Sequence, residues 1–563
     1  MSPSVPVGEV RLLGDRALLI GVADAAAGRA LAGELATHVG KGVDVVCGSA
    51  TVLVHAVEPD TELSQLRAAV DEVRTAHARR DATDEPSDEA PGPSRLVTIP
   101  CRFDGPDLDE VAALAGCRVS DVTAMLTARP LTASVMGFSP GFAYLEGLPN
   151  PLDRVPRRAR PRPAVPAGSL AVANGHAAVY PTASPGGWHL VGRTGFPLFT
   201  ADGPPYAVLA PGDRVQFTLA DPDDVAEPGA VRPPSWSVPP DARAVLEIVA
   251  PGLRAVLQDD GRRAVAPVGI PGAGPSDPIS FDLANRLVGH AAAVGTLELT
   301  GGGIRLRCLS SCHVAVVGAA PDVRVDGTPE RHGQLLPLAP GQVLEVGRLR
   351  GGCRTYLAVA GGFLGPVWFG STATDELTGL GAGPLAAGAV LHAGAWAPPL
   401  GDHLVTGSAT MLDGTAPVVL RALPGPHAEQ FGTDALAQLA AAVFEVQPAS
   451  NRVGIRLRAE SGPVALCGRG GGGALDSHGV VTGTVQVPPD GDPVVLLPDH
   501  ATLGGYPVLA VVAATDHGRL GQCAPGTRVR FVPIDLAAAA EAWRATRREL
   551  AGAVIGTYPL AVD

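Results

Sequence analysis

The chain of 563 residues carries 56 acidic and 43 basic side chains, and the resulting net charge of −13 argues against wholesale binding of nucleic acid or an anionic membrane surface. Its length requires several domains, and 46% hydrophobic residues indicate packed cores despite 71 glycines and 54 prolines. Lys41 is the only lysine, which excludes a P-loop nucleotide site and leaves no site for covalently attached biotin.

Residues 1–80 are expected to form a small α/β domain. Hydrophobic patterning predicts two short strands over residues 10–22, a helix over 25–38, strands over 44–58 and an amphipathic helix over 62–78. The polar, proline-containing segment 79–95 is typical of a linker.

Most of the remaining chain is predicted to be β structure, because short Val- and Leu-rich runs are broken by Gly, Pro and Asp. The expected domains cover residues 96–220, with one helical stretch at 107–126, then 242–400 and 415–535, after a proline-rich linker at 221–240. The tail 536–563 begins with a helix for which Asp535 is the expected N-cap. Since no apolar run reaches transmembrane length and the first residues do not resemble a signal peptide, we expect a cytoplasmic protein with no membrane partner.

Two stretches far apart in the chain indicate a duplicated unit. The first contains, in order, residues 168–172 (GSLAV), 184–188 (SPGGW) and 211–217 (PGDRVQF); the second contains 483–487 (GTVQV), 502–506 (TLGGY) and 525–531 (PGTRVRF). Pro-Gly opens a tight turn before an alternating strand, and a Gly-Gly-aromatic run can bend sharply or approach a ligand closely. The shared order predicts two related β units.

Two neighbouring segments could form a binding site. Residues 137–145 (GFSPGFAYL) could wall an apolar ligand pocket, or they could be a turn fixed to its own core by Phe138 and Phe142. Four arginines between residues 157 and 162 lie on a proline-stiffened stretch, which suits recognition of carboxylate or phosphate; a solvated connector is the alternative.

Candidate proton carriers occur in both halves of the chain. His176 and His189 flank the first Gly-Gly turn, but no carboxylate or cysteine stands at metal-ligand spacing, so we expect no metal site, and ordinary partly buried histidines are the alternative. Asp277 ends a glycine-rich approach to a helix, which could bind an anion, although N-capping alone would account for it. Glu298 alternates with two leucines in a predicted strand, so it is either an acid or base at a barrel mouth or a solvated surface carboxylate.

Together these motifs resemble the B-type and C-type subunits of 5-oxoprolinase joined head to tail. The resemblance to the B type is carried by residues 137–145, 165–169 (VPAGS), 184–188 and 192–194 (GRT). The resemblance to the C type is carried by residues 258–289, 358–362 (AVAGG), 423–426 (LPGP), 451–454 (NRVG) and 486–491 (QVPPDG). The same superfamily includes the carboxyltransferase region of urea carboxylase, proteins formerly named allophanate hydrolase subunits 1 and 2, and a Kip-type inhibitor and antagonist of a sporulation kinase.

The resemblance implies a mainly β fold in which tandem cyclophilin-like β-barrel domains follow the α/β domain. It also implies ATP-dependent opening of 5-oxo-L-proline to L-glutamate, with ATP (and Mg²⁺) as co-substrate and with the separate A-type 5-oxoprolinase subunit for a partner, in a self-associating or hetero-oligomeric protein. On this basis the predicted catalytic residues are Asp277, Glu298 and His176. The predicted substrate- or nucleotide-binding residues are Phe138, Ser139, Arg157, Arg162, Ser169, Gly186, Gly187, Trp188, Arg193, Gly504, Gly505 and Tyr506.

The chain departs from the family pattern at several positions. These are Leu126 (usually His), His176 (Gln), Ser276 (Met), Thr372 (Arg), His427 (Gln) and His478 (Glu). Because two charges are lost, two further functions stay open: carboxyl transfer from a separate biotinylated protein to urea or a related amide, and non-enzymatic regulation of a histidine kinase.

Overall fold

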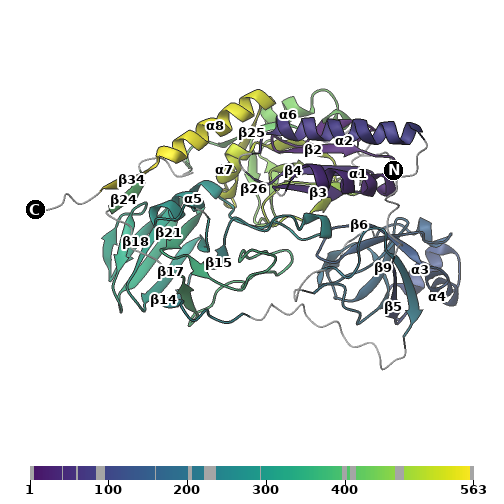
Figure 1. Cartoon of the computed structure of the whole chain (residues 1–563), viewed down its shortest axis with the longest axis horizontal. Coiled ribbons are helices and arrows are strands. Elements are labelled where there is room, and N and C mark those ends of the chain that lie inside the picture. The colour runs from purple at the N-terminus through teal and green to yellow at the C-terminus, as the bar shows by residue number, and fades with distance from the viewer. Residues whose placement is uncertain are drawn as a thin grey trace, which may run out of the picture.

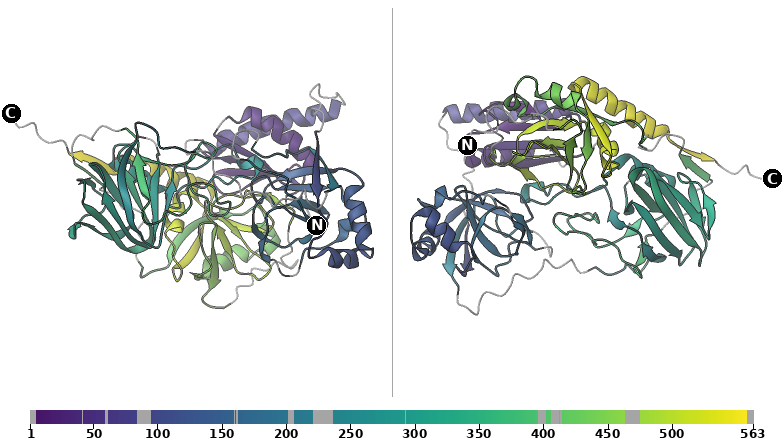
Figure 2. Two further views of the ribbon diagram at one scale, coloured as in Figure 1. Left: turned by 90° about the horizontal axis from the view of Figure 1, so that it is seen from below. Right: turned by 180° about the vertical axis from the view of Figure 1, so that it is seen from behind.

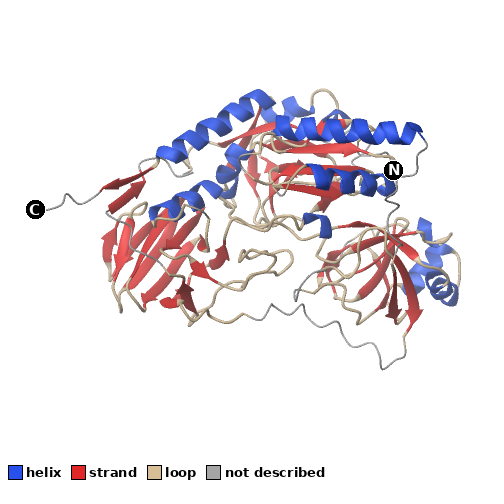
Figure 3. Cartoon of the chain, viewed as in Figure 1, coloured by secondary structure: helices blue, strands red, loops and turns tan. Residues whose placement is uncertain are grey.

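The computed structural model describes residues 5–40, 42–58, 61–83, 95–158, 160, 162–200, 206–220, 236–291, 293–395, 402–405, 412, 414–462 and 475–557. Most of the regular structure is β, and the longest helices lie on the outer surface (Figure 3). Four bodies are visible: an N-terminal domain (residues 5–83), a first barrel (95–220), a middle domain (236–395) and a second barrel (414–533). In Figure 1 the N-terminal domain and the second barrel form an upper layer, with the first barrel and the middle domain below it at opposite ends.

The N-terminal domain is an antiparallel sheet with two helices on one face. The strands are β1 (Val10–Leu12), β2 (Ala17–Gly21), β3 (Val43–Cys47) and β4 (Thr51–Ala56), in the order β1-β2-β4-β3, and the helices are α1 (Ala25–His38) and α2 (Leu63–Thr83). Leu18 and Ile20 pack under the helices, whereas Ala17 and Leu19 face an apolar cluster shared with both barrels. Because both of its faces are covered, β2 is a continuous apolar run. Helix α2 continues five residues past the expected end, to Thr83.

The first barrel is a seven-stranded sheet in the order β12-β9-β10-β7-β6-β13-β5, with a two-stranded ribbon of β8 and β11. Its elements are β5 (Leu96–Cys101), α3 (Leu108–Ala115), α4 (Val119–Thr127), β6 (Leu131–Met136), β7 (Ala143–Glu146), η1 (Leu152–Arg154), β8 (Arg162–Val165), β9 (Ser169–Ala173), β10 (His176–Val179), β11 (Ser184–Gly186), β12 (His189–Arg193) and β13 (Arg214–Leu219). The single helix expected over residues 107–126 is wrong: Gly116 adopts φ 66° and ends α3 in a left-handed cap before α4 begins.

The second barrel repeats this strand order, which confirms the predicted duplication. It is a closed barrel in the order β25-β32-β29-β30-β27-β26-β33, with a ribbon of β28 and β31. Its elements are β25 (Val418–Pro424), η3 (Ala428–Phe431), α6 (Ala435–Ala441), β26 (Phe444–Val446), β27 (Gly454–Ala459), β28 (His478–Gly479), β29 (Thr484–Gln486), β30 (Val494–Leu496), β31 (Leu503–Gly504), β32 (Val508–Val512), η4 (Ala514–Asp516), α7 (His517–Gly521) and β33 (Arg528–Pro533). In both barrels the strand after the Pro-Gly turn is parallel to the first strand, pairing Phe217 with Ile99 and Phe531 with Leu420. The first barrel closes less fully, through one bridge between Arg102 and Arg193.

The middle domain is a ten-stranded sheet with one helix on its outside. Its elements are β14 (Arg243–Pro251), β15 (Arg254–Gln258), η2 (Ala266–Val268), α5 (Pro278–Leu287), β16 (Thr296–Thr300), β17 (Gly302–Cys308), β18 (Cys312–Val325), β19 (Thr328–Glu330), β20 (Leu335–Leu338), β21 (Val343–Val359), β22 (Phe363–Leu364) and β23 (Val390–Ala393). The C-terminal helix α8 (Leu536–Gly552), capped by Asp535 as predicted, runs from the second barrel toward the middle domain (Figure 2). There β34 (Val554–Thr557) pairs with β24 (Asp402–Val405). Within the described ranges, no helix is both long and apolar enough to cross a membrane.

The two halves of the chain are docked crosswise. The N-terminal domain of the first half packs on the second barrel: the Asp15 carboxylate accepts a hydrogen bond from the Ala514 amide (3.1 Å), and the Ser49 amide donates to the Ser477 carbonyl (2.8 Å). Leu53 of this domain shares an apolar cluster with Leu503 of the second barrel. This docking brings loops of three domains to one junction.

Candidate functional site

The predicted aromatic residues of the first barrel pack on one another at the junction. The ring centroids of Phe138 and Phe142 are 5.2 Å apart, those of Phe142 and Trp188 are 5.9 Å apart, and His176 lies 6.4 Å from Trp188. Leu503 of the second barrel belongs to the same buried cluster. The rings therefore form a core that is shared between domains, whereas the turn alternative described a segment fixed to its own core.

The two Gly-Gly turns lie in the two ribbons, at equivalent positions. A Cβ added at Gly186 would clash with the Tyr180 hydroxyl, and one at Gly504 would clash with the Gln486 amide. Each glycine thus permits a close approach by a polar side chain. Gly187 and Gly505 use their carbonyls to accept from the amides of Arg158 and Leu475, and Tyr506 is 39% exposed.

The predicted anion-binding arginines are largely neutralised within the first barrel. Arg162 and Arg158 both donate to Asp107, at 2.6 and 2.8 Å, and Arg193 pairs with Asp104 at 3.1 Å. Burial opposes ionisation of Asp107, but the hydrogen bond from Arg162 and the neighbouring charges lower its pKa. These ion pairs fix the connector to the barrel, as the connector alternative describes, and the assignment of the arginines to phosphate or carboxylate recognition stays a prediction. Two other predicted binding residues lie in the same segment. Arg157 is exposed. The Ser169 hydroxyl donates a hydrogen bond to the Pro166 carbonyl at 2.8 Å.

Asp277 and Glu298 are linked through the Tyr356 hydroxyl, at the contact between the middle domain and the second barrel. Asp277 caps α5 by accepting from the Ser280 amide and hydroxyl, and it also accepts from the Gln522 amide group (2.8 Å). Glu298 is fully buried and accepts from the Ser276 amide (2.9 Å) and the Tyr356 hydroxyl (2.8 Å). Glu298 is therefore not a solvated surface carboxylate. His176 lies elsewhere, in the first barrel, 3.6 Å from Glu146, so the predicted catalytic residues are divided between two places.

Arg452 is the centre of this buried network. Its guanidinium pairs with Asp499 through two 2.9 Å hydrogen bonds and also donates to Glu298 and to the Ser276 hydroxyl. Burial alone would raise the pKa of Glu298, but the charges of Arg452 and Arg354 outweigh it and hold the pKa at about 2. Glu298 consequently stays ionised near neutral pH and joins two domains, and its role as an acid or base stays a prediction.

Two departures from the family pattern are in contact. The ring centroids of His427 and His478 lie 4.8 Å apart, and both residues are buried in the second barrel. Of the others, Leu126 is core, and Thr372 donates to Asp259 through its amide and hydroxyl. The replacement of the family's Gln and Glu by two histidines is therefore a single local change.

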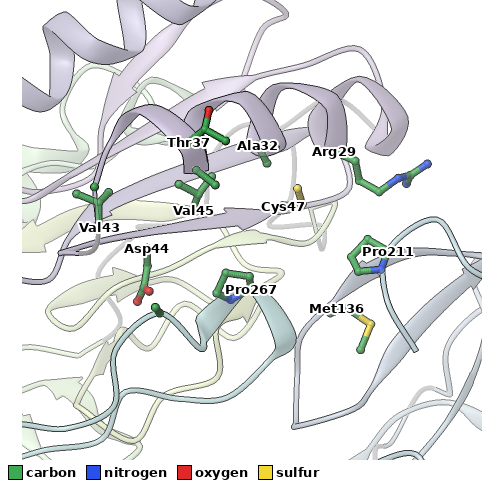
Figure 4. Close-up of a pocket in the computed structure, with 14 residues that line it drawn as sticks. Arg29, Ala32, Thr37, Val43, Asp44, Val45, Cys47, Met136, Pro211 and Pro267 are labelled. Atoms are coloured by element: carbon green, nitrogen blue, oxygen red, sulfur yellow. The ribbon is translucent and has the colours of Figure 1, made fainter. Parts of the chain in front are cut away.

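A groove and a small chamber meet at the junction of the domains, on either side of β3. The groove has a volume of about 690 Å³ and is lined by α1, by β3, by Met136 and by the loop carrying Ala264 and Pro267 (Figure 4). In Figure 4 Val43 and Val45 point toward α1, whereas Asp44 points toward the loop that carries Pro267. Asp44 also lines the chamber, which has a volume of about 130 Å³. Asp44 is thus common to both cavities.

The chamber is built from both halves of the chain. Its polar lining residues are Asp44 and His55 from the N-terminal domain, Asp260 and Arg262 from the middle domain, and Thr482, His500 and Thr502 from the second barrel. The remaining lining is mainly apolar. Within the described part of the chain, Asp44 Oδ1, Arg262 Nε and Nη1, and Thr502 Oγ1 are buried without a hydrogen-bond partner. Unpaired buried polar atoms are costly, and in a cavity they indicate a place for a polar ligand or water.

Burial shifts the ionisable groups of the chamber toward their neutral forms. It raises the pKa of Asp44 to about 6, against the opposing effect of the Ala264 amide, and it lowers the pKa of His55 to about 3. The pKa of His500 is also lowered by burial. Asp44 can therefore exchange a proton near neutral pH, and the two histidines are neutral there.

Sequence reasoning missed Asp44, Arg452 and Asp499. Asp44 stands between two valines in a strand, and this pattern is equally typical of a polar residue on the solvent-exposed face of a strand. Arg452 lies within the NRVG motif, whose resemblance to the C-type subunit was a usable signal. Arg262 lies in the run 258–262 (QDDGR), which also carried that resemblance without being assigned a role.

Comparison with known proteins covers both halves. Residues 8–209 match the family described as carboxyltransferase domain, subdomain C and D, and residues 268–533 match carboxyltransferase domain, subdomain A and B. The chain is 33% identical over 306 residues to the C-type 5-oxoprolinase subunit of Escherichia coli K12, covering 53% of the chain and 94% of that relative. It is 42% identical over 127 residues to the B-type 5-oxoprolinase subunit of Escherichia coli O157:H7, covering 22% of the chain and 58% of that relative.

A further relative and a crystal structure extend this comparison. A putative urea carboxylase of Emericella nidulans is 30% identical over 298 residues, which are 51% of the chain and 24% of that relative. The crystal structure of TTHA0988 is 31% identical, with a TM-score of 0.79 over 92% of the chain and 100% of that protein. A solved protein therefore shares nearly the whole arrangement of domains.

Proposed function

We propose a function for this chain from one premise: it belongs to the carboxyltransferase-domain family that contains the B-type and C-type subunits of 5-oxoprolinase. On that premise, it is the fused B and C component of an ATP-dependent 5-oxoprolinase. With the separate A-type subunit, it opens 5-oxo-L-proline to L-glutamate.

The observation that carries the proposal is the composition of the chamber. Asp44 and His55 come from the half that resembles the B type, whereas Arg262 and Thr502 come from the half that resembles the C type. A site divided in this way is complete only when the two halves are docked. This supports one active component made from both.

The properties of the junction suit the activation of a small amide. A lactam carbonyl resists attack by water, and transfer of a phosphoryl group from ATP to its oxygen would activate it. The proposal assigns the lactam to the chamber and the phosphate donor to the groove, because Asp44 lines both and the groove has the volume of an ordinary ligand site. Asp44, with a pKa of about 6, is the group available to accept or return a proton at the lactam nitrogen.

The direct test is reconstitution. The purified chain is mixed with the A-type subunit from its own source organism, 5-oxo-L-proline, ATP and Mg²⁺, and glutamate and phosphate are measured. Glutamate formed in proportion to phosphate supports the proposal, and Asp44→Asn should reduce the rate about 100-fold or more, as expected for loss of a general acid–base. Asp322→Asn is the matched control, because Asp322 is exposed on the middle domain and pairs only with a surface arginine among the contacts described. No turnover in the complete mixture would contradict the proposal.

A second candidate is carboxyl transfer to urea or a related amide. It is favoured by the similarity of the second half to a putative urea carboxylase over 298 residues. Since the sequence offers no lysine in a biotin-carrier context, this activity needs a separate biotinylated protein. Bicarbonate- and biotin-carrier-dependent consumption of ATP with urea, and none with 5-oxoproline, would favour it.

A further inference from the structure

The guanidinium of Arg262 is buried at the chamber wall with unused donors. Arg262 is 2% exposed. Its Nη2 donates to the Ala373 carbonyl, and its backbone amide donates to the Gly272 carbonyl, which fix the base of the side chain and one end of the guanidinium. Its Nε and Nη1 have no hydrogen-bond partner among the described residues. The Nε–H and Nη1–H donors point to different sides of the guanidinium, so either one can donate a charge-assisted hydrogen bond to a carboxylate or phosphate oxygen while the other is available to a second acceptor.

The three carboxylates whose charges act on Arg262, those of Asp375, Asp259 and Asp499, each accept hydrogen bonds from other groups. Asp499 is held by Arg452 through two hydrogen bonds. Asp259 accepts from the Thr372 amide and the Ser371 hydroxyl, and Asp375 accepts from the Thr378 amide and hydroxyl. Burial, together with the charge of Asp499, raises the pKa of Asp375 to about 7, so much of it is protonated at neutral pH. Among the described residues, no carboxylate therefore forms a hydrogen bond with Arg262.

The rest of the chamber restricts the ligand that Arg262 can meet. A volume of about 130 Å³ holds roughly four waters at about 30 Å³ each, which is too little for a nucleotide. The walls include Val46, Leu53 and Val480, and His55 is neutral because its pKa is about 3. Asp44 Oδ1 can accept from an N–H group, and Thr502 Oγ1 can donate to a carbonyl oxygen or accept from a donor.

We propose that Arg262 recognises the carboxylate of the substrate, so that the chamber selects a small cyclic amide carrying a carboxylate over neutral amides. The identity of that amide as 5-oxoproline rests on the proposed function. The anionic group accepts a hydrogen bond from a free donor of Arg262 beside the guanidinium charge, the ring packs on the apolar wall, and the amide N–H faces Asp44. Urea and unsubstituted lactams lack the anionic group and leave Arg262 unpaired.

The test compares three ligands on the full-length chain by calorimetry, with no other protein present. The probes are 5-oxo-L-proline, 2-pyrrolidinone (the same ring without the carboxylate) and inorganic phosphate. The wild type should bind 5-oxoproline about 10- to 100-fold more tightly than 2-pyrrolidinone, the value of hydrogen bonds to a charged group. In Arg262→Met this ratio should fall to about one, because only the affinity for 5-oxoproline decreases. Arg262→Lys should recover part of the preference, since it restores the charge without the planar guanidinium and its fixed donor directions.

Several outcomes would overturn the inference. They are equal affinity of the wild type for the two lactams, no binding of 5-oxoproline, an unchanged ratio in Arg262→Met, or loss of phosphate binding in that variant with the lactam ratio kept. Arg350→Gln is the matched control, since it removes an exposed charge from the same domain, and it should keep the wild-type ratio. The wild-type comparison needs no variant, so it stands even if Arg262→Met fails to fold. Selective binding without turnover in the reconstituted mixture would contradict the proposed function and leave this inference intact.

Discussion

The buried network around Arg452 and the chamber around Arg262 are neighbours with opposite properties. Both contain an arginine that is 2% exposed, and both join the middle domain to other domains. Arg452 donates to Asp499, Glu298, Ser276 and the Gly274 carbonyl, so its donors are used. Arg262 has two nitrogens without a partner among the described residues.

This difference distinguishes buried polar groups that stabilise the fold from buried polar groups that are available to a ligand. A buried charge with partners holds domains together, whereas a buried charge without them lowers stability unless something binds there. Strain at a functional site is commonly offset elsewhere in the fold. Here the satisfied network lies next to the unsatisfied chamber, and Asp499 is close enough to both to influence Asp375 and Arg262.

The largest effect should come from breaking the network. Arg452→Met leaves Asp499 and Glu298 buried without their main partner, which should destabilise the protein by about 3–5 kcal/mol. The matched change in the first barrel is Arg162→Met, where Asp107 keeps Arg158, and it should cost about 1 kcal/mol. Thermal and urea unfolding measure both. Equal losses of stability in the two variants would show that the Arg452 network contributes no more to the stability of the fold than the ion pairs of the first-barrel connector.

The stability that the network contributes should depend on pH through the protonation of Glu298. The pKa of Glu298 is about 2 in the folded protein, below its ordinary 4.5, so its stabilisation is complete above about pH 4.5 and is lost as the pH falls toward 2. Glu298→Gln should therefore cost roughly 3 kcal/mol at pH 7 and progressively less in acid. Melting temperatures of both proteins between pH 3 and 7, about the range in question, give the comparison. A constant difference across that range would contradict the assignment.

Ionisation of Asp44 in the chamber should change the stability in the opposite direction. Its pKa is raised from 3.8 to about 6, so the folded protein binds the proton more tightly, and stability decreases as the pH rises from about 4 to about 6. Asp44→Asn should thus stabilise the protein by about 2 kcal/mol at pH 8, with no gain near pH 4, while turnover is lost. The variant is compared with the wild type in melts at the two pH values. If Asp44→Asn were less stable than the wild type at pH 8, the Asp44 carboxylate would be a group that stabilises the fold.

The smallest effect on stability is expected for the hydroxyls. Thr502→Val removes a buried hydroxyl without a described partner and should change stability by less than about 0.5 kcal/mol, whereas Ser276→Ala removes a hydrogen bond from Arg452 and should cost about 1 kcal/mol. Chemical denaturation resolves these differences when several replicates are averaged. A larger loss for Thr502→Val than for Ser276→Ala would reverse the comparison between the two regions.

The repeated barrels were predictable because their signals are local. Turn residues and alternating strands are written in short segments, and the segments containing Gly186 and Gly504 occupy equivalent ribbons, as their shared sequence order indicated. The end of α3 at Gly116 was also a local signal, but a glycine within a helical pattern does not by itself decide between a cap and a tolerated interior position.

The site was less predictable because its contacts are long-range. Arg452 is 154 residues from Glu298 and 178 from Gly274, so each has the local pattern of an ordinary surface charge or turn. Glu298 could be placed on the strand face opposite its leucines, but what covers that face depends on the docking of another domain. The role of Asp44 depends likewise on a loop that begins more than two hundred residues later, at Arg262.

The crosswise docking of the two halves has a consequence for assembly inside a cell. Two separate proteins that share a chamber must meet by diffusion, so the fraction of complete sites falls with dilution and with unequal synthesis. Joining them in one chain replaces that encounter by an intramolecular one, with an effective concentration that reaches the millimolar range for short flexible connections. The contact between Asp15 and Ala514 can then be individually weak and still be formed nearly all the time. The stoichiometry of the two halves is fixed at one to one by synthesis.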